Sequence, residues 1–570
     1  MPRNAPAAAS VGARHLGRDR MHAALVALRA LPPGVRRWVA TRLRGHHLPV
    51  LAVLAMAADG RHEEALSALD DAAEGASPRR LRRLVAAAAA LDAPSLATRL
   101  LAELGETDRD RHRLEALVAE REGNLIRDEP ATRRANRLRR RLDGELAAFG
   151  AAHGRSSDRA GDRRLVPRLG SVLHLVTNAL PEVTAGYTVR THGIAAAQRA
   201  IGLDAHVATR LGFPVTAGHL GAARSVEVDG VPYHRIVPFR WLPATDDRAL
   251  RLDIDQTAKL VTRLRPAVLH AHSKHINAQV ALALADRFGL PVVYEVRGFL
   301  EETWRSRGHD SHADRYRLAR QAETRCMSAA DAVVTLAETM KAEIVGRGID
   351  PARVTVIPNA VDHGFLDRAP DPGPTRRRLG FLADDVVVGL VTTVNPYEGI
   401  ETLLEAVSTL HGRGEPVRVL VVGGGPALAG LRGRATDLGL GETAVFTGPV
   451  PFADIRSYYA AIDVFCVPRA DTPVTRLVTP LKPLEAMATG RPVVASDLAP
   501  LREIVDPGRT GMLATPGDPT SLAGAIEPLL YDATSRSRMG VAARQWIAEH
   551  RTWTAAANRY RDLYRRLGDV

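Results

Sequence analysis

The chain has few of the residues that mark secreted or membrane-spanning proteins. Only two of its 570 residues are cysteines, Cys326 and Cys466, so a disulfide framework is excluded and a reducing cytoplasm is the expected compartment. No apolar run approaches the roughly 20 residues that cross a bilayer, and the longest candidate, 48–58, is too short. The N-terminus is basic without an apolar core, so a secretory signal is not expected.

Lysine and aromatic residues are also scarce. Lysine occurs only at positions 259, 274, 341 and 482, so arginine supplies nearly all of the positive charge behind the net +13. Residues 1–168 hold 31 Arg and 21 Asp plus Glu, which gives 31 − 21 = +10 and leaves +3 for the rest. This asymmetry indicates either an anionic partner or a solvated basic surface. Nucleic acid is disfavoured because the basic region lacks interleaved aromatics.

Residues 1–150 are rich in Ala, Leu and Arg and show helical periodicity. The stretch 48–69 reads as a helix, a Gly turn and a second helix, and it resembles a tetratricopeptide-type hairpin. Further helix pairs are expected within 81–104 and 111–117, but no fixed period of about 34 residues is visible. We therefore predict a basic helical interaction region, followed by a polar, Gly-rich linker over 151–168.

From residue 169 onward, apolar strand runs alternate with amphipathic helices, which indicates parallel sheets covered by helices. An acidic, Pro-rich break at 367–374 separates two such series, so we predict two Rossmann-like α/β domains, 169–370 and 371–570, facing one cleft. The last helix is expected to cross back to the first domain. The predicted strands are 172–177, 205–208, 267–270, 292–296, 332–336 and 354–357, then 386–391, 417–422, 444–447, 464–467 and 493–495.

The most informative motif is TRLVTPLKPLEAMATGRPVVASD at 475–497. It places Lys482 and Glu485 on the first turns of a helix that opens just after Pro480. A helix N-terminus offers unpaired N–H groups and partial positive charge to phosphate, and a carboxylate accepts hydrogen bonds from ribose hydroxyls. The motif therefore predicts a site for a sugar diphosphate.

This segment closely resembles the donor-binding helix of glycosyltransferase family 4. Members of that family transfer a sugar from a nucleotide-sugar donor with retention of anomeric configuration, and they have the GT-B fold of two facing Rossmann-like domains. The resemblance covers about residues 170–565. It implies donor contacts from Thr479, Leu481 and Glu485. It also implies a mechanism without metal or other cofactor, in which Arg476, Lys482 and backbone amides assist departure of the nucleoside diphosphate.

Two motifs in the first domain match the same family. The loop NALPEVTAGYTVRTHG follows the first strand, and the resemblance places Gly186, Tyr187 and Arg190 beneath the donor sugar and diphosphate; an ordinary strand-to-helix turn is the alternative. The strand ending LHAHS directs His270 and His272 to the same side, and the family's HxH pattern places His272 near the anomeric centre. Metal ligation by this pair lacks a third ligand at convincing spacing.

The following strand ends in YEVRGFLEETW, where most family members have His in place of Arg297. A branch acting in exopolysaccharide synthesis resembles this sequence better. In that reading Arg297 is a fixed cation for a phosphate or an acidic sugar. The alternative is an ion pair with Glu295, Glu301 or Glu302.

The second domain departs from the family pattern at its diphosphate site. Thr393 and Glu398 stand where the family has an Arg and a Lys, and Leu477 stands where it has a first donor-site Glu. Because two phosphates need compensating charge, we expect Arg476 and Lys482 to replace the missing cations. The motifs YEG and KPLEAMA occur together in the exopolysaccharide-type branch, which indicates a coordinated exchange. Recognition of the donor sugar stays open.

We interpret the chain as a cytoplasmic glycosyltransferase, peripheral at the inner face of the membrane, that acts on a glycan or lipid-linked acceptor in cell-surface polysaccharide or glycoconjugate synthesis. Two alternatives remain: a non-catalytic scaffold, favoured by the missing cations, and a nucleotide-sugar 2-epimerase of the same fold. A partner of residues 1–168 is expected to be anionic membrane or protein. Asp253 and Asp255 form a DxD, which we interpret as a helix-capping pair.

Overall fold

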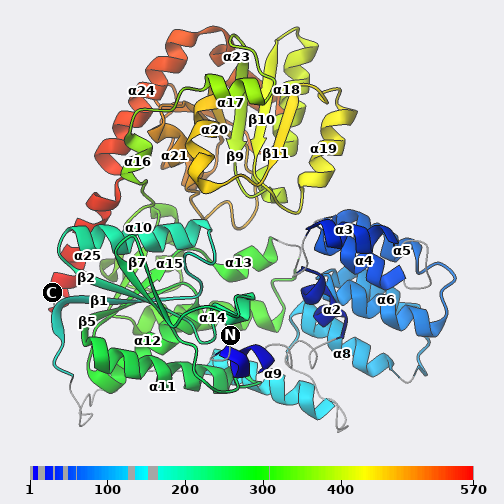
Figure 1. Cartoon of the computed structure of the whole chain (residues 1–570), viewed down its shortest axis with the longest axis vertical. Helices are drawn as coiled ribbons and strands as arrows, with labels where there is room; N and C mark the ends of the chain where they lie inside the picture. Colours follow the sequence, from blue (N-terminus) through cyan, green and yellow to red (C-terminus); the bar gives the residue numbers. More distant parts are fainter. Residues whose placement is uncertain are drawn as a thin grey trace.

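The computed structural model describes residues 4–10, 20–29, 33–42, 49–59, 61–108, 110–125, 135–151, 165–306 and 309–568. These residues form a helical bundle and two α/β domains (Figure 1). Most of the predicted linker, 152–164, lies outside the described residues. Within them, no helix is both long and apolar enough to cross a membrane.

The first α/β domain is built on an eight-stranded sheet in the order β3-β4-β2-β1-β5-β6-β7-β8, in which only the β3–β4 pair is antiparallel. Its central strands are buried on both faces, which explains their continuous apolar sequences. The strands are β1 Arg168–Val176, β2 Asp204–Thr209, β3 Ser225–Val228, β4 Val231–Arg235, β5 Pro266–His272, β6 Val292–Val296, β7 Ala332–Thr335 and β8 Val354–Val356. The helices are α10 Gly186–Ala200, α11 Asp246–Leu264, α12 His275–Phe288, α13 Leu300–Arg305, α14 Asp314–Ala329 and α15 Glu338–Gly346. The short helix α16 His363–Leu366 follows them, and its Phe365 packs in the core of the second domain.

The second α/β domain has an all-parallel sheet of six strands in the order β11-β10-β9-β12-β13-β14. The strands are β9 Val386–Val391, β10 Val417–Val422, β11 Ala444–Gly448, β12 Val464–Val467, β13 Val493–Ser496 and β14 Gly511–Ala514. The helices are α17 Gly373–Arg378, α18 Ile400–Gly412, α19 Leu428–Asp437, α20 Ile455–Ala461, α21 Lys482–Ala488, α22 Ala499–Arg502, α23 Pro519–Tyr531 and α24 Ala533–His550. The GT-B fold predicted from the sequence is confirmed.

The last helix, α25 Trp553–Arg566, leaves the second domain and packs on the first, beside α10 (Figure 1). Its Trp553, Tyr560 and Tyr564 join a core cluster with residues of the first sheet. Gly193 of α10 makes this approach possible, because a Cβ there would lie 2.5 Å from the Trp553 ring. The C-terminal helix therefore ties the two domains together.

The region 1–150, predicted as one helical unit, is divided in the structure. Its bundle consists of α2 Arg20–Arg29, α3 Pro33–Arg42, α4 Pro49–Ala58, α5 His62–Asp71, α6 Pro78–Ala90, α7 Pro94–Ala102 and α8 Arg111–Glu122. By contrast, α9 Ala135–Gly150 packs against α11 and α14 of the first α/β domain. The N-terminal residues also pack there, since the Asn4 side-chain amide donates to the carbonyl oxygens of Leu220 and Ala222.

The bundle is attached to α13 and α14, the helices that follow strand β6. The backbone N–H of Arg315 donates to the Gly123 oxygen, and the N–H of Leu125 donates to the Asp314 carboxylate at 3.0 Å. The Trp304 ring packs against Gly123, where a Cβ would come within 2.6 Å of it. The bundle therefore lies beside elements that follow the carboxyl edge of the first sheet.

The interpretation of the DxD as a capping pair is wrong. Asp253 lies in the interior of α11, where its buried carboxylate accepts hydrogen bonds from the Leu211 backbone and the Thr257 hydroxyl. Burial raises the pKa of Asp253 to about 6, although both hydrogen bonds act against the rise. The residue fixes the loop after β2 to α11.

Candidate active site

The two domains meet through loops at the carboxyl edges of their sheets. A Cβ on Gly186, at the start of α10, would lie 3.3 Å from Leu481, and one on Gly298, after β6, would lie 3.7 Å from Val478. The backbone N–H of Val474 donates to the Ser306 hydroxyl at 3.2 Å. The segment 471–481, which we call the donor loop, therefore lies against the first domain, and ligands of open parallel sheets bind at such edges.

Three buried histidines form a hydrogen-bonded chain below this junction. Gln198 donates to the Tyr564 hydroxyl through its amide nitrogen, so its oxygen, 2.7 Å from His174 Nε2, accepts a hydrogen bond from that ring. The Tyr564 hydroxyl also lies 2.7 Å from His270 Nδ1, which joins His270 to the chain. His174 Nδ1 then accepts from His272 Nε2 at 2.8 Å. Burial lowers the pKa of His174 to about 3 and holds the pKa of His272 well below its ordinary value. The rings are therefore neutral.

These histidines are the group best placed to hold a metal ion. Ring nitrogens of His174, His270 and His272 lie within 4.8 Å of one another, so the structure supplies the third residue that the sequence lacked. However, the His270 and His272 rings stack face to face, with centroids 4.3 Å apart and an angle of 25° between them. A metal needs convergent lone pairs. The stacked rings therefore fit a hydrogen-bonded chain better than a metal site.

Glu295, at the end of β6, is the charged centre of the site floor. One carboxylate oxygen accepts from Arg190 Nε at 2.9 Å and from Arg297 Nε at 2.6 Å. The other accepts from the Tyr560 hydroxyl of α25 and lies 3.2 Å from His270 Nε2. Burial acts to raise the pKa of the Glu295 carboxyl, but the two guanidinium groups outweigh it and hold that pKa well below its ordinary range.

Arg190 lies beneath the site, which corrects its assignment as a donor contact. All three of its side-chain nitrogens have protein partners, including Glu295, the Ile357 and Pro358 carbonyl oxygens and Asn359. The Asn359 amide in turn donates to the Thr479 oxygen in the donor loop at 3.2 Å. Arg190 therefore fixes the segment that joins the domains, and it has no nitrogen to offer a diphosphate.

Arg297 forms the ion pair with Glu295 that was the alternative to a free cation. Its Nη1 also donates to the Tyr187 carbonyl oxygen and the Thr191 hydroxyl. Its Nη2 is buried and has no hydrogen-bond partner in the described part of the chain, whereas the Nδ1 of His272 lies 3.5 Å from the Glu295 carboxylate. The floor thus retains a donor atom on Arg297. Tyr187 itself is exposed, with its hydroxyl accepting from Asn178.

The second domain contributes a carboxylate and an ammonium from α21. The Glu485 side chain is half-buried, and its Oε2 accepts a hydrogen bond from the Tyr459 hydroxyl of α20. Burial raises the pKa of Glu485, while the nearby Lys482 ammonium and Tyr459 act in the opposite direction. Lys482 makes no ion pair within 4 Å in the described residues. A carboxylate with one oxygen held and a free ammonium one turn earlier suit a ribose and a phosphate.

The position of the missing family Lys is filled by a buried ion pair that sequence reasoning did not find. Glu398 accepts from Arg469 at 2.9 Å, and Arg469 also donates to the Val478 oxygen in the donor loop. Gly399 allows the two loops to meet, because a Cβ there would lie 1.8 Å from the Pro468 oxygen. Since Glu398 neutralises Arg469, this pair positions the donor loop and adds no net charge for a diphosphate.

The remaining predicted donor residues are distributed around this point. The Arg476 side chain is 64% exposed, and its Nε lies 2.5 Å from an Asp471 carboxylate oxygen. Among the described residues, Arg476 has no hydrogen bond or ion pair with Glu485. Thr393 exposes its side chain after β9. Thr479 and Leu481 are buried in the donor loop, between the two domains. The structure therefore brings Lys482 and Glu485 together and leaves Arg476 on the surface.

We expect Tyr459→Phe to weaken donor binding in a pH-dependent way. The hydroxyl stabilises the ionised Glu485 carboxylate, so its loss should raise the pKa of Glu485 further. The rise in donor KM on acidification should then begin at a higher pH than in the parent, because a protonated carboxyl accepts ribose hydrogen bonds poorly. Steady-state kinetics between pH 5 and 9 test this. A KM profile that keeps its midpoint would exclude Tyr459 from this role.

Comparisons with known proteins agree with this arrangement. A family model described as "Glycosyl transferase 4-like domain" matches residues 185–360, and one described as "Glycosyl transferases group 1" matches residues 385–532. The chain is 32% identical over 262 residues to the GDP-mannose-dependent alpha-(1-6)-phosphatidylinositol monomannoside mannosyltransferase of Mycolicibacterium smegmatis, covering 45% of this chain and 68% of that protein. It is 30% identical over 366 residues to the D-inositol 3-phosphate glycosyltransferase of Kineococcus radiotolerans, covering 59% and 81%.

Solved structures show the same fold at low sequence identity. Sucrose-phosphate synthase from Thermosynechococcus elongatus superposes with a TM-score of 0.57 at 21% identity, covering 70% of this chain and 99% of that one. Anabaena HepE in complex with UDP gives 0.56 at 20% identity, covering 69% and 99%. With both domains matched by family models and two relatives matched over at least two thirds of their length, the chain belongs to glycosyltransferase family 4 and is a GT-B enzyme that transfers glycosyl groups.

Proposed function

We propose that this enzyme transfers a sugar from a nucleotide-sugar donor to a glycan or lipid-linked acceptor, with retention of anomeric configuration, in the synthesis of a cell-surface polysaccharide or glycoconjugate. The observation that supports this best is the pairing of Glu485 and Lys482 on α21, directly after the donor loop that lies on the first domain. The carboxylate is assigned to the donor ribose. The ammonium is assigned to the diphosphate.

Few positive charges are then available to stabilise the departing nucleoside diphosphate. Arg469 is neutralised by Glu398, and Arg476 reaches the diphosphate only by leaving Asp471. Lys482 is free to stabilise the negative charge that develops on the leaving group, which is the largest contribution expected in such a reaction. The acceptor hydroxyl attacks on the face that the leaving group vacates, and its proton passes to an oxygen of the departing diphosphate. Neither metal nor other cofactor is assigned a role.

We expect Lys482→Ala to lower kcat at least tenfold, or about 1.4 kcal/mol of activation free energy. The physical reason is the loss of the ammonium that meets the diphosphate, whose charge would otherwise be poorly compensated. Single-turnover kinetics with the best donor would measure the effect. Arg476→Ala is the companion variant: a comparable loss would show that Arg476 leaves Asp471 in the donor complex. Unchanged turnover in Lys482→Ala would remove Lys482 from the mechanism.

The first domain supplies the acceptor side. Arg297 Nη2 is a donor left without a partner on the floor in the described part of the chain, and it suits a sugar hydroxyl of the donor or the acceptor. The family resemblance assigns the neighbouring His272 to the anomeric centre. The two relatives named above act on a phosphatidylinositol mannoside and on an inositol phosphate, so both use phosphate-bearing acceptors. We infer an acceptor of similar polarity and a place of action at the inner face of the membrane, reached from the cytoplasm.

Thr393 and Glu398 stand where the family has two diphosphate-binding cations, so the donor and the outcome of transfer need a direct test. Thermal-shift screening with nucleotide sugars identifies the donor, and NMR of the product formed with that donor gives the anomeric configuration. Retained anomeric configuration in a transferred sugar supports the proposal. Donor binding without transfer or release of nucleoside diphosphate, or an inverted sugar centre at C2, would contradict it.

A further inference from the structure

The first α/β domain has an aromatic loop that packing does not explain. Residues 239–241, between β4 and α11, read Phe-Arg-Trp, and the outer two side chains are 66% and 60% exposed. Aromatic residues make up only 4% of the chain. Two exposed aromatic side chains within three residues therefore form an unusual apolar patch on this surface. Exposed apolar patches mark interaction sites.

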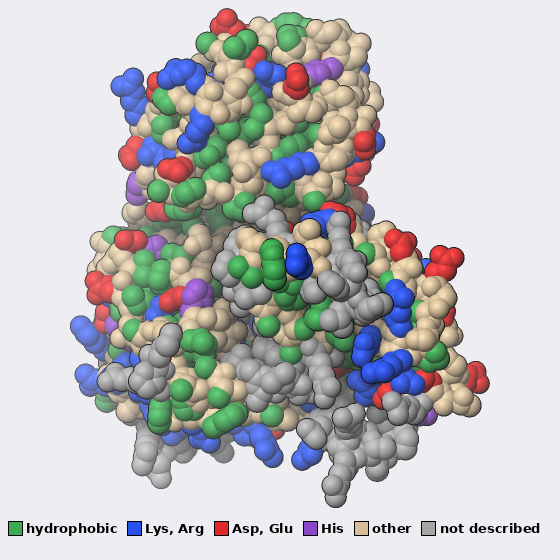
Figure 2. Space-filling view, turned by 45° about the vertical axis from the view of Figure 1, so that its right-hand side comes forward, with side chains coloured by type: hydrophobic (Ala, Val, Ile, Leu, Met, Phe, Trp, Pro, Cys, Tyr) green, Lys and Arg blue, Asp and Glu red, His purple; other side chains and the backbone are tan. Residues whose placement is uncertain are grey.

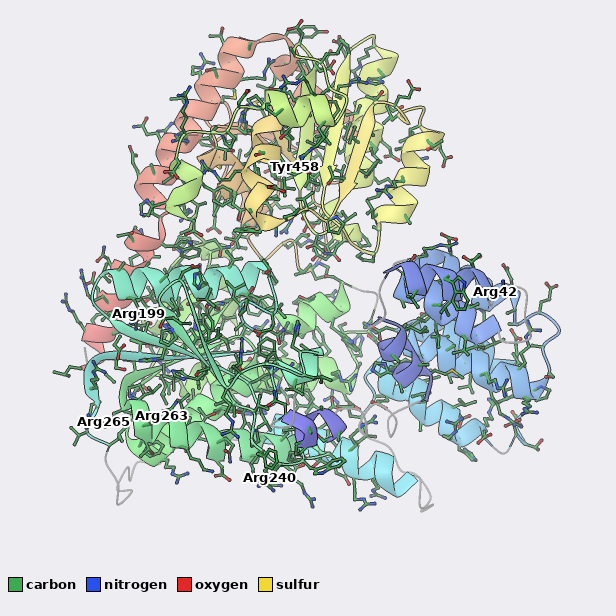
Figure 3. All side chains as sticks on the ribbon, in the orientation of Figure 1. Arg42, Arg199, Arg240, Arg263, Arg265 and Tyr458 are labelled. Atoms are coloured by element: carbon green, nitrogen blue, oxygen red, sulfur yellow. The ribbon has the colours of Figure 1, made fainter. Side chains whose placement is uncertain are left out.

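The same side of the domain carries a row of cations. Along α11, Arg248, Lys259 and Arg263 are exposed, and a shallow groove beside them is lined by Lys259, Arg240 and Arg287 together with Asp255. Figure 3 labels Arg240, Arg263 and Arg265 along the lower edge of the domain. Figure 2 shows Lys and Arg side chains recurring along that lower edge. We call the exposed residues of 239–241 and α11, with Arg265 and Arg287, the basic face.

The basic face is not balanced by neighbouring acids. The face has six exposed cations that make no ion pair in the described structure, and two exposed acids, which gives 6 − 2 = +4. Arg251 is not counted because it pairs with Asp247. The six cations are Arg240, Arg248, Lys259, Arg263, Arg265 and Arg287, and the acids are Asp246 and Asp255. Some other surface arginines, such as Arg434 with Glu405, are paired. The face is thus complementary to an anionic surface.

We propose that the basic face docks on an anionic lipid bilayer. Aromatic side chains favour the interface between lipid and water, and each Lys or Arg near an anionic leaflet adds attraction. The loop 239–241 follows the carboxyl end of β4, the sheet edge that also carries the site. Docking through it brings the acceptor side of the enzyme to the membrane, which is the part of the inference that rests on the proposed function.

The helical bundle offers the competing surface. On α3, Trp38 is 63% exposed and Val35 and Arg42 are also exposed. This helix has one exposed aromatic and, among its described side chains, one exposed cation. The basic face has two aromatics and six unpaired cations in one place. We therefore place the contact on the first α/β domain, although the net charge of residues 1–168 is higher.

Co-flotation of the full chain with vesicles tests this. Phosphatidylcholine vesicles with and without phosphatidylglycerol are compared for the parent and for two double variants, Phe239→Ser/Trp241→Ser and Lys259→Glu/Arg263→Glu. We expect binding only to the anionic vesicles, falling at least about tenfold in the charge variant and clearly in the aromatic variant. Matched controls in the second domain, Phe452→Ser/Tyr531→Ser and Arg377→Glu/Arg538→Glu, alter equally exposed side chains and should bind like the parent.

Several results would overturn the proposal. Equal binding to both kinds of vesicle would remove the role of charge, and loss of binding in Trp38→Ser alone would place the contact on α3. A change of oligomeric state in Phe239→Ser/Trp241→Ser, measured by light scattering, would identify the face as an interface between copies. The rise in melting temperature that a nucleoside diphosphate causes without membranes should be the same in all variants. Because this measurement needs no acceptor, it keeps a failure of membrane docking distinct from a failure of the proposed donor site.

Discussion

Glu295→Leu should destabilise the protein by about 3–5 kcal/mol, because it leaves two buried guanidinium groups without their shared carboxylate. Arg190 and Glu295 are almost fully buried, and Arg297 is 8% exposed. None of the three can recover its hydration in the folded state. The Tyr560 hydroxyl of α25 would also lose its acceptor, so the contact between the C-terminal helix and the first domain should weaken.

The effect is measured as a fall in the melting temperature of the first domain, of roughly 6–20 °C for a domain of this size. A matched control is Asp497→Ala, which removes an exposed partner of Arg502 and should change stability little. The double variant Arg190→Met/Glu295→Leu also removes one of the two buried guanidinium groups, so it should recover part of the lost stability. A melting temperature unchanged in Glu295→Leu would contradict the assignment of this carboxylate as the charged centre of the floor.

The same ion pairs predict how stability depends on pH. The pKa of Glu295 is held well below its ordinary value, so its contribution is present above the ordinary range of a glutamate. It is lost only as the pH falls through the lowered pKa of the folded state.

Glu485→Ala should weaken the binding of nucleoside diphosphate by about 2 kcal/mol, or roughly thirtyfold in Kd, as for a lost hydrogen bond to a charged group. The variant removes the acceptor assigned to the ribose hydroxyls and also leaves the buried Tyr459 hydroxyl without its partner. Isothermal titration with the nucleoside diphosphate of the preferred donor measures this change.

A control separates the two effects of that substitution. Glu485→Gln keeps an oxygen for Tyr459 but loses the charge, so it should bind the nucleoside diphosphate more tightly than Glu485→Ala does. The Tyr459→Phe variant reports the loss of the hydroxyl alone. Unchanged affinity in Glu485→Ala would remove Glu485 from the donor site, whatever the melting temperature of the variant.

Local sequence patterns predicted most of the sheet, because parallel strands buried on both faces have continuous apolar sequences. All eleven predicted strands correspond to strands of the structure, with ends that differ by a few residues. The hairpin β3–β4 and the edge strand β14 were not predicted. The first lies partly exposed at a sheet edge and contains polar residues, and the second has only four residues, so neither gives a strong apolar signal.

The site was predicted where a motif lies on a single element and was missed where partners come from distant segments. Lys482 and Glu485 are three residues apart on α21, so their proximity follows from helical spacing. Arg469, Glu398 and Tyr459 meet only in the folded domain. His174 offered one usable signal: it lies in an apolar strand next to the one that carries the HxH motif. Arg190 could not be placed from the sequence, because its partners are up to 370 residues away.

Release of nucleoside diphosphate across a panel of nucleotide sugars tests the central claim most directly. We predict that one donor supports release with acceptor-containing membranes present, and that Lys482→Ala and Glu485→Ala both reduce that release. Because Lys482 makes no ion pair in the described residues, Lys482→Ala should keep the melting temperature of the parent. If no donor supports release, and no nucleoside diphosphate raises the melting temperature of the parent protein, the assignment of a donor site to α21 is contradicted.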